Sequence, residues 1–263
     1  MSAVPTGVDS SKPSVARMYD YYLGGKDNYV VDREAAERMM TAVPESVDMV
    51  RANREFLAQA VRRLAAEAGI RQFLDIGSGL PTRQNVHEVA QAVAPDCRVV
   101  YVDHDPLAVV HGQALLATSP GTAYVHGDLR RPAEILAAPE VRELIDFDQP
   151  VAILIVAILH FINTDDDPAG IVRTLRDSMA PGSHLAISHV LADPRTGAIG
   201  DILSASGAPR WSPRTREQIL PFFDGFELID PGLALLAEWV PHPTPDLRWQ
   251  VAGVGRLTPS VGE

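Results

Sequence analysis

The sequence predicts an α/β protein with a mostly parallel sheet and helices on both of its faces. After Gly69, short apolar segments alternate with amphipathic helical segments, which is typical of successive strand-helix units. The segment 151–157 is apolar without alternation, as expected for a central strand that is covered on both faces. Apolar residues at helical spacing before Gly69 add an N-terminal helical cap to this core.

The N-terminal part divides into a tail and this cap. Residues 1–12 are small and polar, and we predict them to be disordered. Residues 13–69 form the predicted cap, in which glycines end the first and third helices. The cap helices are expected from Pro13 to Leu23, from about Asp32 onward, and from about Ser46 to Ala68.

The core is predicted over residues 70–263, and with the cap it would make one domain, residues 13–263. Strands are expected near 71–76, 98–103, 122–126, 150–157, 183–189, 226–229 and 249–254. Helices are expected near 83–93, 106–117, 132–145, 168–179 and 212–221. Two segments with glycines or prolines, 190–212 and 231–246, are interpreted as long loops that either form lids or cover the sheet.

The composition argues against a nucleic-acid-binding protein and against a membrane protein. The chain has 34 acidic and 23 basic residues, a net charge of −11, and no basic run interleaved with aromatic residues. Its longest apolar run, 151–159, is about half of what a bilayer span requires. The start of the chain carries no charged segment followed by an apolar one. We therefore expect a cytoplasmic, soluble protein that acts on a small molecule, and the sequence does not indicate an oligomeric state.

Neither a disulfide nor a metal site is predicted. Cys97 is the one cysteine of the chain, which rules out an intramolecular disulfide and a cluster of thiolates. The three acids 165–167 precede Pro168, and such a run is more typical of a helix start than of a metal site.

The most informative segment is an apolar strand that ends in an acid and a glycine turn, Leu74-Asp75-Ile76-Gly77-Ser78-Gly79. A second strand ends in Asp103, and this combination is how α/β proteins hold the ribose of an adenosine ligand. A dinucleotide site requires a third glycine at the position of Thr82. Asp75 would repel a pyrophosphate, whereas its charge suits an ammonium group. The pattern favours S-adenosylmethionine (SAM) over NAD, and a tight turn without a ligand is the alternative.

Several blocks of the chain together resemble the class I SAM-dependent methyltransferases, and in particular an actinobacterial family first catalogued as a domain of unknown function. The most specific block is Tyr22-Leu23-Gly24-Gly25-Lys26-Asp27-Asn28. The other blocks are 74–82, 101–106, 127–130, 158–162 and 182–189. The resemblance implies a Rossmann-like sheet of seven strands with the last strand antiparallel, and a cofactor across the carboxyl ends of the first two strands. Pro81 stands where many of these enzymes have a third glycine.

The candidate cofactor-binding residues follow from this turn and from the two strand ends after it. Asp103 is expected to accept hydrogen bonds from the ribose hydroxyls, although it could instead cap the next helix. Asp128 and the backbone of Leu129 are assigned to the adenine, with helix capping as the alternative for Asp128. His104 either lies against the adenine or is a surface histidine. The backbone of Gly77, Ser78 and Gly79 is expected to approach the ligand closely.

The N-terminal block adds further candidates. Tyr19 and Tyr22 lie one helical turn apart and could close over the sulfonium, whose charge is attracted to aromatic faces, or they could pack as core residues. The turn at Gly24 and Lys26 either holds the methionine carboxylate or only ends the helix.

Two histidines are candidate general bases, because His160 and His189 follow the fourth and fifth strands on the side where ligands bind. Each could instead be a hydrogen-bonded histidine without a catalytic role. We predict a SAM-dependent methyltransferase that acts on oxygen, nitrogen or carbon of a small acceptor. The alternatives are a non-catalytic SAM-binding regulatory protein and, less favoured, an NAD-dependent oxidoreductase.

Overall fold

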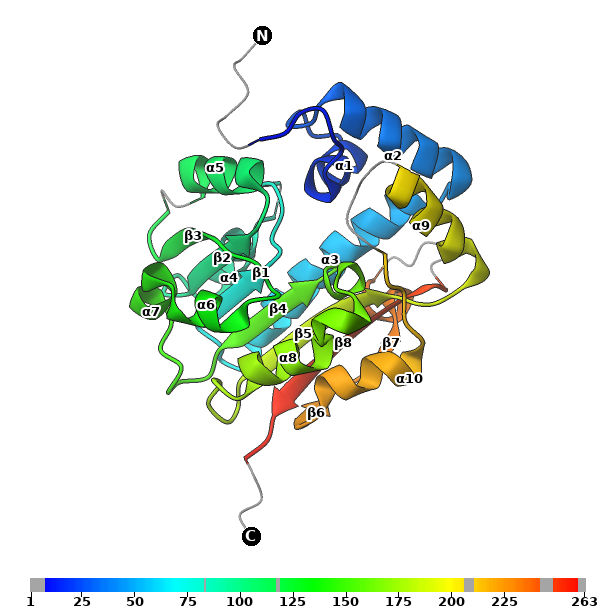
Figure 1. Cartoon of the computed structure of the whole chain (residues 1–263). Helices are drawn as coiled ribbons and strands as arrows, with labels where there is room; N and C mark the ends of the chain where they lie inside the picture. The colour runs from blue at the N-terminus through cyan, green and yellow to red at the C-terminus, as the bar shows by residue number, and fades with distance from the viewer. Residues whose placement is uncertain (1–7, 83, 117–118, 206–210, 242–247, 260–263) are drawn as a thin grey trace.

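The protein is a twisted α/β sheet with helices on both faces, and two helices lie across one end of the sheet (Figure 1). The computed structural model describes residues 8–82, 84–116, 119–205, 211–241 and 248–259. The strands are β1 (Gln72–Ile76), β2 (Arg98–Asp103), β3 (Thr122–His126), β4 (Ala152–Val156), β5 (His184–Val190), β6 (Phe226–Leu228), β7 (Ala234–Leu235) and β8 (Gln250–Leu257).

The sheet has the order β3-β2-β1-β4-β5-β8-β6, and β7 pairs with β8 beside this path. Strands β1 to β5 are parallel, whereas β8 runs antiparallel to β5, β6 and β7. The mostly parallel sheet with an antiparallel last strand is confirmed. The predicted number of seven strands is wrong by one, because β7 has only two residues and follows Pro231 and Gly232, too short a segment to give a strand pattern.

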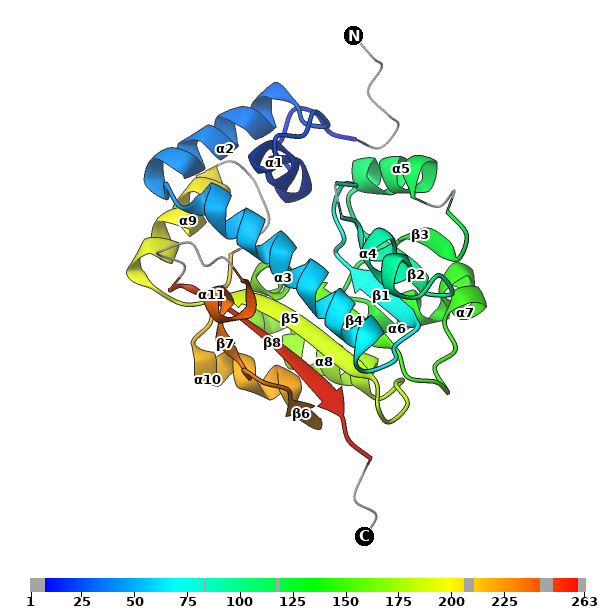
Figure 2. The same cartoon turned by 180° about the vertical axis from the view of Figure 1, so that it is seen from behind.

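Two layers of helices cover the sheet. The helices are α1 (Val15–Tyr22), α2 (Val30–Ala42), α3 (Ser46–Ala66), α4 (Val86–Val93), α5 (Pro106–Leu115), α6 (Pro132–Ala137), α7 (Pro139–Leu144), α8 (Pro168–Arg176), α9 (Pro194–Ala205), α10 (Arg216–Ile219) and α11 (Leu236–Trp239). Helices α3, α4 and α11 share one apolar core with one face of the sheet, and Figure 2 shows them on that side. Helices α6, α7 and α8 share a second core with the other face.

The alternation of strand residues explains the two cores. In β1, Phe73 belongs to the first core and Leu74 to the second, and in β4 Ile153 and Leu154 divide in the same way. Because both faces are covered, these strands are apolar throughout, as the sequence of β4 predicts.

The third N-terminal helix differs in place from the prediction of a three-helix cap. Helix α3 packs along the sheet against β4, β5 and β8 rather than over its end (Figure 2). Its 21 residues carry a continuous apolar stripe that includes Phe56, Val61 and Leu64, all of them buried. Of the three N-terminal helices, α1 and α2 therefore lie over the end of the sheet.

Two other predicted elements change for local reasons. The helix expected over 132–145 is two short helices, because Pro139 has no N–H to donate and keeps Ala138 extended. The loop expected over 190–212 contains α9, which packs beside α2. Gly197 and Gly200 lie inside α9 and lower its intrinsic helix propensity.

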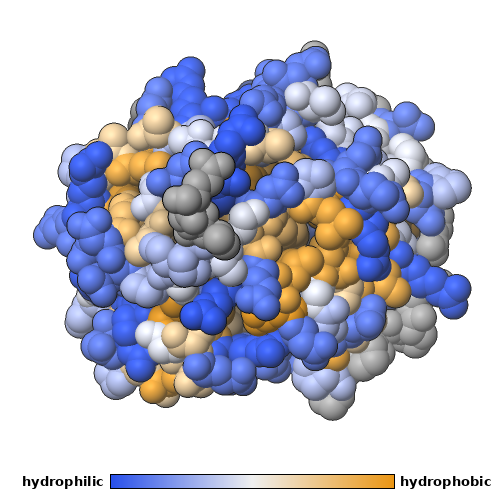
Figure 3. Space-filling view, turned by 90° about the horizontal axis from the view of Figure 1, so that it is seen from below, coloured by the Kyte–Doolittle hydropathy of each residue, from blue (hydrophilic) through white to orange (hydrophobic). Residues whose placement is uncertain are grey.

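The predicted N-terminal tail, residues 1–12, is described only from Val8 onward. Residues 8–12 lie close to α1, where Arg17 donates hydrogen bonds to the carbonyl oxygens of Asp9 and Lys12. Among the helices of the described residues, none has the length and apolar character needed to cross a membrane. The face opposite α1 and α2 carries an apolar area framed by hydrophilic residues (Figure 3).

Candidate active site

A cavity of about 530 Å³ lies where the parallel strands end, below α1 and α2. Its volume is in the range of small-molecule sites. One half, the cofactor half, is formed by the residues that follow β1, β2 and β3: Asp75, Gly77, Ser78, Gly79, Asp103 and Asp128. The other, the remote half, lies toward β4, β5 and β8 and includes Tyr22, His160, Phe161, Trp211, Trp249 and Gln250. In the sheet order, β2 of the cofactor half and β5 of the remote half are three strand intervals apart, which is about 14 Å at roughly 4.8 Å for each interval.

The glycine turn after β1 is held against the neighbouring strands. The Gly77 N–H donates to the Val102 carbonyl at 2.7 Å, and the Gly79 carbonyl accepts from the Tyr124 hydroxyl at 2.8 Å. Both glycines have positive φ, 76° and 68°. A Cβ at Gly77 would lie 2.4 Å from side-chain carbons of Ile158, whereas a Cβ at Gly79 would meet no atom within 4 Å. Gly77 is thus required by packing, and Gly79 leaves open space at the cavity wall.

The carboxylate of Asp103 is buried beside this turn. One oxygen accepts from the Gly79 N–H at 2.7 Å, and the other accepts from the Asp105 N–H at 2.8 Å. Asp103 does not cap the next helix, because Asp105 is the N-cap of α5 and accepts from the Leu107 N–H at 2.8 Å. The fixed carboxylate keeps further acceptor capacity for ligand hydroxyls on the cavity side.

His104 lies next to Asp103 on the cavity wall and is exposed. Its Nδ1 lies 3.5 Å from an Asp103 oxygen, and this partner raises the pKa of His104 against the opposing effect of burial. A partly protonated imidazole is therefore available beside the position expected for the adenine.

Asp128 and Leu129 both line the cavity after β3. The Asp128 carboxylate accepts from the Arg130 backbone N–H at 3.0 Å and from the Arg130 guanidinium at 2.5 Å. Burial works against ionisation of Asp128, but these hydrogen bonds outweigh it and keep its pKa below the ordinary value. Arg130 thus competes for the oxygens that the sequence assigned to the adenine.

Asp75 is the buried acid at the end of β1. Burial, opposed by the charge of Arg54 and assisted by the nearby charge of Asp103, raises the pKa of Asp75 to about 7. Arg54 lies on α3, lines the cofactor half and donates from Nη2 to the Gln84 carbonyl at 3.0 Å. A buried carboxyl group that titrates near neutrality fits a cationic ligand group better than a phosphate.

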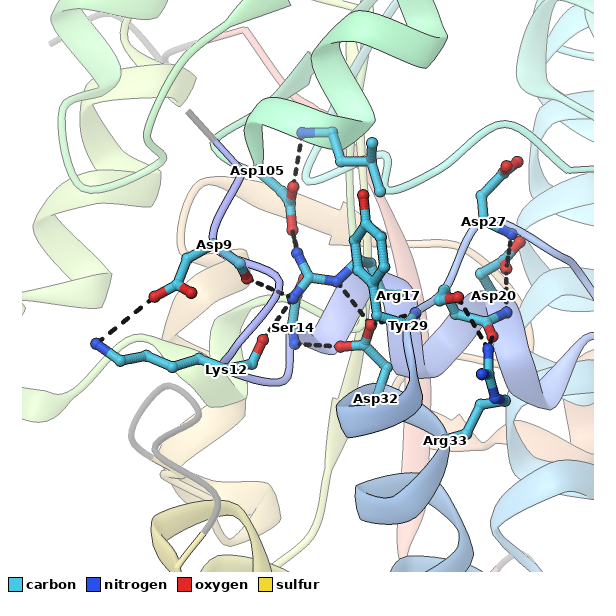
Figure 4. Close-up of polar contacts among 12 residues, drawn as sticks. Asp9, Lys12, Ser14, Arg17, Asp20, Asp27, Tyr29, Asp32, Arg33 and Asp105 are labelled. Carbon is cyan, nitrogen blue, oxygen red and sulfur yellow. Dashed lines mark hydrogen bonds and ion pairs between the residues drawn. The ribbon is translucent and has the colours of Figure 1, made fainter. Parts of the chain in front are cut away.

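The N-terminal block folds around Asp20, and Figure 4 shows this turn beside α1. The Asp20 carboxylate accepts from the Asp27 N–H at 2.9 Å and from the Asn28 side chain at 2.8 Å. A Cβ at Gly25 would lie 1.9 Å from an Asp20 oxygen, so only glycine fits there. Asp20 lines the cavity, whereas Gly24 and Lys26 do not, and both of these are exposed. The structure therefore does not bring Gly24 and Lys26 together with the other candidates.

A buried arginine joins the end-covering helices to the cofactor half (Figure 4). Arg17 of α1 donates from Nε to Asp32 of α2 at 2.8 Å, and its Nη1 lies 3.8 Å from Asp105, the cap of α5. Ser14 donates from its hydroxyl to Asp105 and from its N–H to Asp32. The guanidinium also lies over the Tyr29 ring, 5.3 Å from its centroid. This group of side chains fixes α1 and α2 relative to Asp105, whose N–H donates to Asp103 at the end of β2.

The two tyrosines of α1 take different places. Tyr19 lines the cavity, donates to the Val50 carbonyl at 3.2 Å and accepts from the Asn53 amide at 3.0 Å. Tyr22 lines the cavity and packs in an apolar cluster that contains Met18, Ile199 and Trp249. Burial raises the pKa of Tyr22, so its hydroxyl stays neutral. Tyr22 thus belongs to the remote half.

His160 is buried in the wall of the remote half. Its ring lies 4.6 Å from the Phe161 ring, 5.0 Å from the Trp211 ring and 5.3 Å from the His189 ring, measured between centroids. Burial lowers its pKa well below the usual value, and the electrostatic effects of His189 and Arg214 act in the same direction. The imidazole of His160 is therefore neutral at physiological pH.

His189 does not line the cavity, and both of its ring nitrogens are engaged. Its Nδ1 donates to the Val190 carbonyl at 2.7 Å, and its Nε2 accepts from Arg214 at 3.0 Å. Burial, opposed by the Val190 hydrogen bond and assisted by Arg214, lowers the pKa of His189 to about 3. Arg214 also donates to the carbonyl oxygens of Leu159 and Ile162, so His189 supports the segment that carries His160.

The sequence missed several cavity residues that come from distant segments. Asn53, Arg54, Trp211, Trp249 and Gln250 line the cavity but lie in no local motif. Asn53 accepts at Oδ1 from the Ser188 hydroxyl at 2.5 Å and from the Gln250 amide at 3.2 Å. These partners lie 135 and 197 positions away from Asn53 in the sequence. The polar residues inside the apolar stripe of α3 are the one sequence signal that could have drawn attention to Asn53.

No set of three or more His, Cys, Asp or Glu side chains within the described ranges is arranged to hold a metal ion. In the acidic run before α8, Asp167 is the N-cap and accepts from the Gly170 N–H at 3.0 Å. The helix-start interpretation accounts for that residue.

The residues of the cofactor half fit a ligand that combines a nucleoside with a positive charge. Asp103 offers acceptors at a strand end, Gly79 leaves open space beside it, and the half is rich in carboxylates. Comparison with known proteins gives the same cofactor. A family model described as S-adenosyl methyltransferase matches residues 1–258.

Solved structures support this family. A candidate methyltransferase from Thermobifida fusca is 43% identical, over 97% of this chain and 98% of that chain, with a TM-score of 0.91. A DUF574 family protein from Streptomyces avermitilis is 42% identical, over 95% of this chain and 99% of that chain, with a TM-score of 0.88. Human N-acetylserotonin methyltransferase in complex with SAM shares the fold at 12% identity, over 92% of this chain and 62% of that chain, with a TM-score of 0.50.

None of the curated proteins matches the chain. The family match covers almost the whole sequence, and it agrees with the cofactor that the turn after β1 indicates. The chain belongs to the S-adenosyl methyltransferase family and is a SAM-dependent methyltransferase.

Proposed function

We propose that this enzyme transfers the methyl group of SAM to a small molecule held in the remote half of the cavity. The observation that carries the proposal is the continuity of the cavity: the acids and glycines after β1 to β3 and the aromatic residues near β4, β5 and β8 line the same space. A volume of about 530 Å³ suits a cofactor with a small acceptor. The net charge of −11 disfavours a nucleic-acid acceptor.

In the proposed complex, the cofactor half holds the nucleoside and the amino acid part of SAM. Asp103 accepts from the ribose hydroxyls, and the backbone of Ser78 and Gly79 borders the ligand. Asp128 and Leu129 contact the adenine, and His104 lies beside it. Arg130 gives up part of its hydrogen bonding to Asp128. Asp75 in its ionised form pairs with the ammonium group, and Arg54, whose charge acts on that acid, lines the same cavity and meets the carboxylate of the same ligand.

SAM supplies a methyl group on a positively charged sulfur, which becomes a neutral thioether when an acceptor lone pair forms the new bond to carbon. The protein must therefore align the acceptor and exclude water, and α1, α2 and α9 cover the cavity in a way that serves this purpose. Tyr19 and Tyr22 extend from α1 into the cavity wall.

His160 is the proposed partner of the acceptor. A neutral buried imidazole can accept a hydrogen bond from an acceptor O–H or N–H and take its proton as the methyl group arrives. His189 is not proposed as a base, because its ring is held by Val190 and Arg214. Gly24 and Lys26 are left out of the proposed site, because neither lines the cavity.

The test is stoichiometric methyl transfer. The protein is incubated with methyl-labelled SAM and a panel of small alcohols, phenols, amines and carbon nucleophiles, and labelled product and S-adenosylhomocysteine are both measured. We expect one acceptor class to give the two products in equal amounts, and His160→Gln to slow turnover without changing the affinity for S-adenosylhomocysteine. Tight binding of S-adenosylhomocysteine with no product from any class would contradict the proposal and favour a SAM-binding regulator.

A further inference from the structure

The remote half contains a concentration of buried polar atoms without partners. Six buried side-chain nitrogen or oxygen atoms of the described residues have no hydrogen-bond partner. Five of them belong to residues that line this one cavity: Tyr22 Oη, Ser46 Oγ, His160 Nδ1, Trp249 Nε1 and Gln250 Oε1. A buried polar group without a partner costs about 1–3 kcal/mol, so five such groups in one place indicate a surface built to meet a ligand.

A chain of hydrogen bonds determines which atom of the Gln250 side chain is left without a partner. Tyr19 must donate its one proton to the Val50 carbonyl, so it can only accept from the Asn53 amide nitrogen. The Asn53 oxygen then accepts from the Gln250 amide nitrogen at 3.2 Å. This leaves the carbonyl oxygen of Gln250, which is 1% exposed, as an acceptor toward the cavity.

The same chain is tied to the strand ends that form the floor of the cavity. Ser188 of β5 donates to the Asn53 oxygen and accepts from the Ala157 N–H at 2.9 Å. Ala157, directly after β4, has φ of 61°, a left-handed conformation that this hydrogen bond helps to hold. The orientation of Gln250 is therefore set by α3, β4 and β5 together, and a donor on the ligand would find it preorganised.

The rest of the remote half is aromatic or aliphatic. The rings of His160, Phe161 and Trp211 form a cluster with centroids 4.6 to 5.5 Å apart. Met18, Ile199 and Leu203 come from the same apolar cluster and line the cavity beside them. Trp211 is held in place because its Nε1 donates to the Thr196 carbonyl of α9 at 2.9 Å.

Charged side chains line the cofactor half instead. The charges of Arg54 and Asp103 both act on Asp75, and Asp20 is bound to the turn at Asp27 and Asn28. Among the described residues of the remote half, none is charged at neutral pH, since the pKa of His160 is strongly lowered. A charged acceptor would lose its hydration there without gaining a counter-charge.

We infer that the remote half takes an uncharged aromatic molecule with a hydroxyl or N–H group, separate from the atom that is methylated, which donates a hydrogen bond to the carbonyl oxygen of Gln250. The inference rests on the proposed function, because it identifies the remote half as the acceptor site. Gln250 is the positioning residue that selects acceptors with a donor, and the rings of Phe161 and Trp211 select for an aromatic ring.

The experiment measures binding of four probes of similar size to the full chain saturated with S-adenosylhomocysteine. The probes are 2-naphthol, naphthalene, 2-naphthoate and decahydro-2-naphthol, and quenching of tryptophan fluorescence with calorimetry reports binding. We expect 2-naphthol to bind about tenfold more tightly than naphthalene, in line with one buried hydrogen bond. We expect the other two probes to bind more weakly than 2-naphthol.

Three variants test whether the effect comes from the named atoms. Gln250→Met keeps the length of the side chain but removes the acceptor, and it should abolish the advantage of 2-naphthol over naphthalene while the affinity for S-adenosylhomocysteine is unchanged. Gln113→Met, on the exposed side of α5, is the matched control and should change neither. Tyr22→Phe removes one of the unpartnered hydroxyls without breaking any hydrogen bond of the described structure, so it should raise the melting temperature of the ligand-free protein.

The outcomes separate the inference from the proposed function. Equal binding of 2-naphthoate and 2-naphthol, equal binding of the saturated and aromatic alcohols, an unchanged preference in Gln250→Met, or no binding of any probe beside bound S-adenosylhomocysteine would each overturn the inference. Failure of S-adenosylhomocysteine itself to bind would instead overturn the proposed function.

Discussion

The stability of the ligand-free protein depends on whether Asp75 is protonated. Its pKa is 3.8 as a free side chain and rises to about 7 in the folded protein because the group is buried. Between these values the folded protein binds more protons than the unfolded chain, so the free energy of unfolding falls as pH rises. The stabilising contribution is complete below pH 3.8 and is lost as pH rises to about 7.

This pH dependence of the free energy of unfolding leads to a prediction for Asp75→Asn. The neutral amide should raise the free energy of unfolding at pH 8 by about 2–4 kcal/mol, with little effect near pH 4. Urea denaturation of the cofactor-free protein at the two pH values measures this difference. Asp96→Asn, at an exposed acid, is the control. A variant that is equally destabilised at both pH values would refute the account of Asp75.

Asp103 is predicted to carry much of the affinity for the nucleoside. Asp103→Ala should weaken SAM binding at least tenfold, about 1.4 kcal/mol, because both ribose hydroxyls would lose their acceptor. Asp148→Ala, at an exposed acid, should bind SAM like the unchanged protein. Calorimetric titration of the two variants compares the affinities, and an unchanged value for Asp103→Ala would remove the ribose assignment.

The pKa values of the histidines are predicted to shift in opposite directions. At pH 5.5, His104 should be largely protonated because Asp103 raises its pKa, whereas His160 and His189 should stay neutral because burial lowers theirs. Since the folded state holds its buried histidines neutral, their contribution to the free energy of unfolding should fall as pH decreases below the ordinary value of 6.5, which is opposite in direction to the contribution of Asp75.

Long-range proton–nitrogen correlation spectra of the imidazole rings measure these protonation states directly. Signals are assigned with the variants His104→Gln, His160→Gln and His189→Gln. A protonated His160 at pH 5.5 would contradict both the burial argument and its proposed role as a hydrogen-bond acceptor.

At the scale of elements, Arg17 determines how α1 and α2 sit on the core. Arg17 is 3% exposed, and its guanidinium meets Asp32 of α2 and Asp105, the cap of α5. Removal of one partner from such a buried group leaves uncompensated charge, so Arg17→Ala should lower the free energy of unfolding by about 3–5 kcal/mol. Arg51→Ala, which removes an exposed pair with Asp48, should change it by less than about 0.5 kcal/mol. Urea denaturation checks both, and similar small losses would show that the Arg17 group does not hold the helices.

The elements that the sequence predicted well are those with strong local signals. Strand β4 is a plain apolar run, and α5 begins with Asp105 and Pro106, a cap and a first-turn proline that the structure contains. Helix α9 was missed because its two glycines are typical of loops, and its formation depends on packing against α2. That packing is a tertiary contact, and no local sequence pattern indicates it.

At the scale of the whole molecule, the two halves of the cavity differ in how far the sequence predicts them. The turn from Asp75 to Gly79 and the acid Asp103 are local patterns at strand ends, so their meeting follows from the parallel order of β1 and β2. The remote half joins Asn53 with Gln250, 197 positions apart, through a contact that no short motif contains. Cofactor binding could therefore be predicted from the sequence, whereas acceptor selection required the structure.

The central claim is that the cofactor half binds SAM, and titration calorimetry of the unmodified protein with SAM, S-adenosylhomocysteine and NAD in parallel tests it most directly. We expect the first two ligands to bind in the micromolar range or more tightly, and SAM to bind more tightly at pH 8 than at pH 6, where Asp75 is largely protonated. NAD should not bind. Binding of NAD, or no binding of either sulfur ligand, would contradict the account.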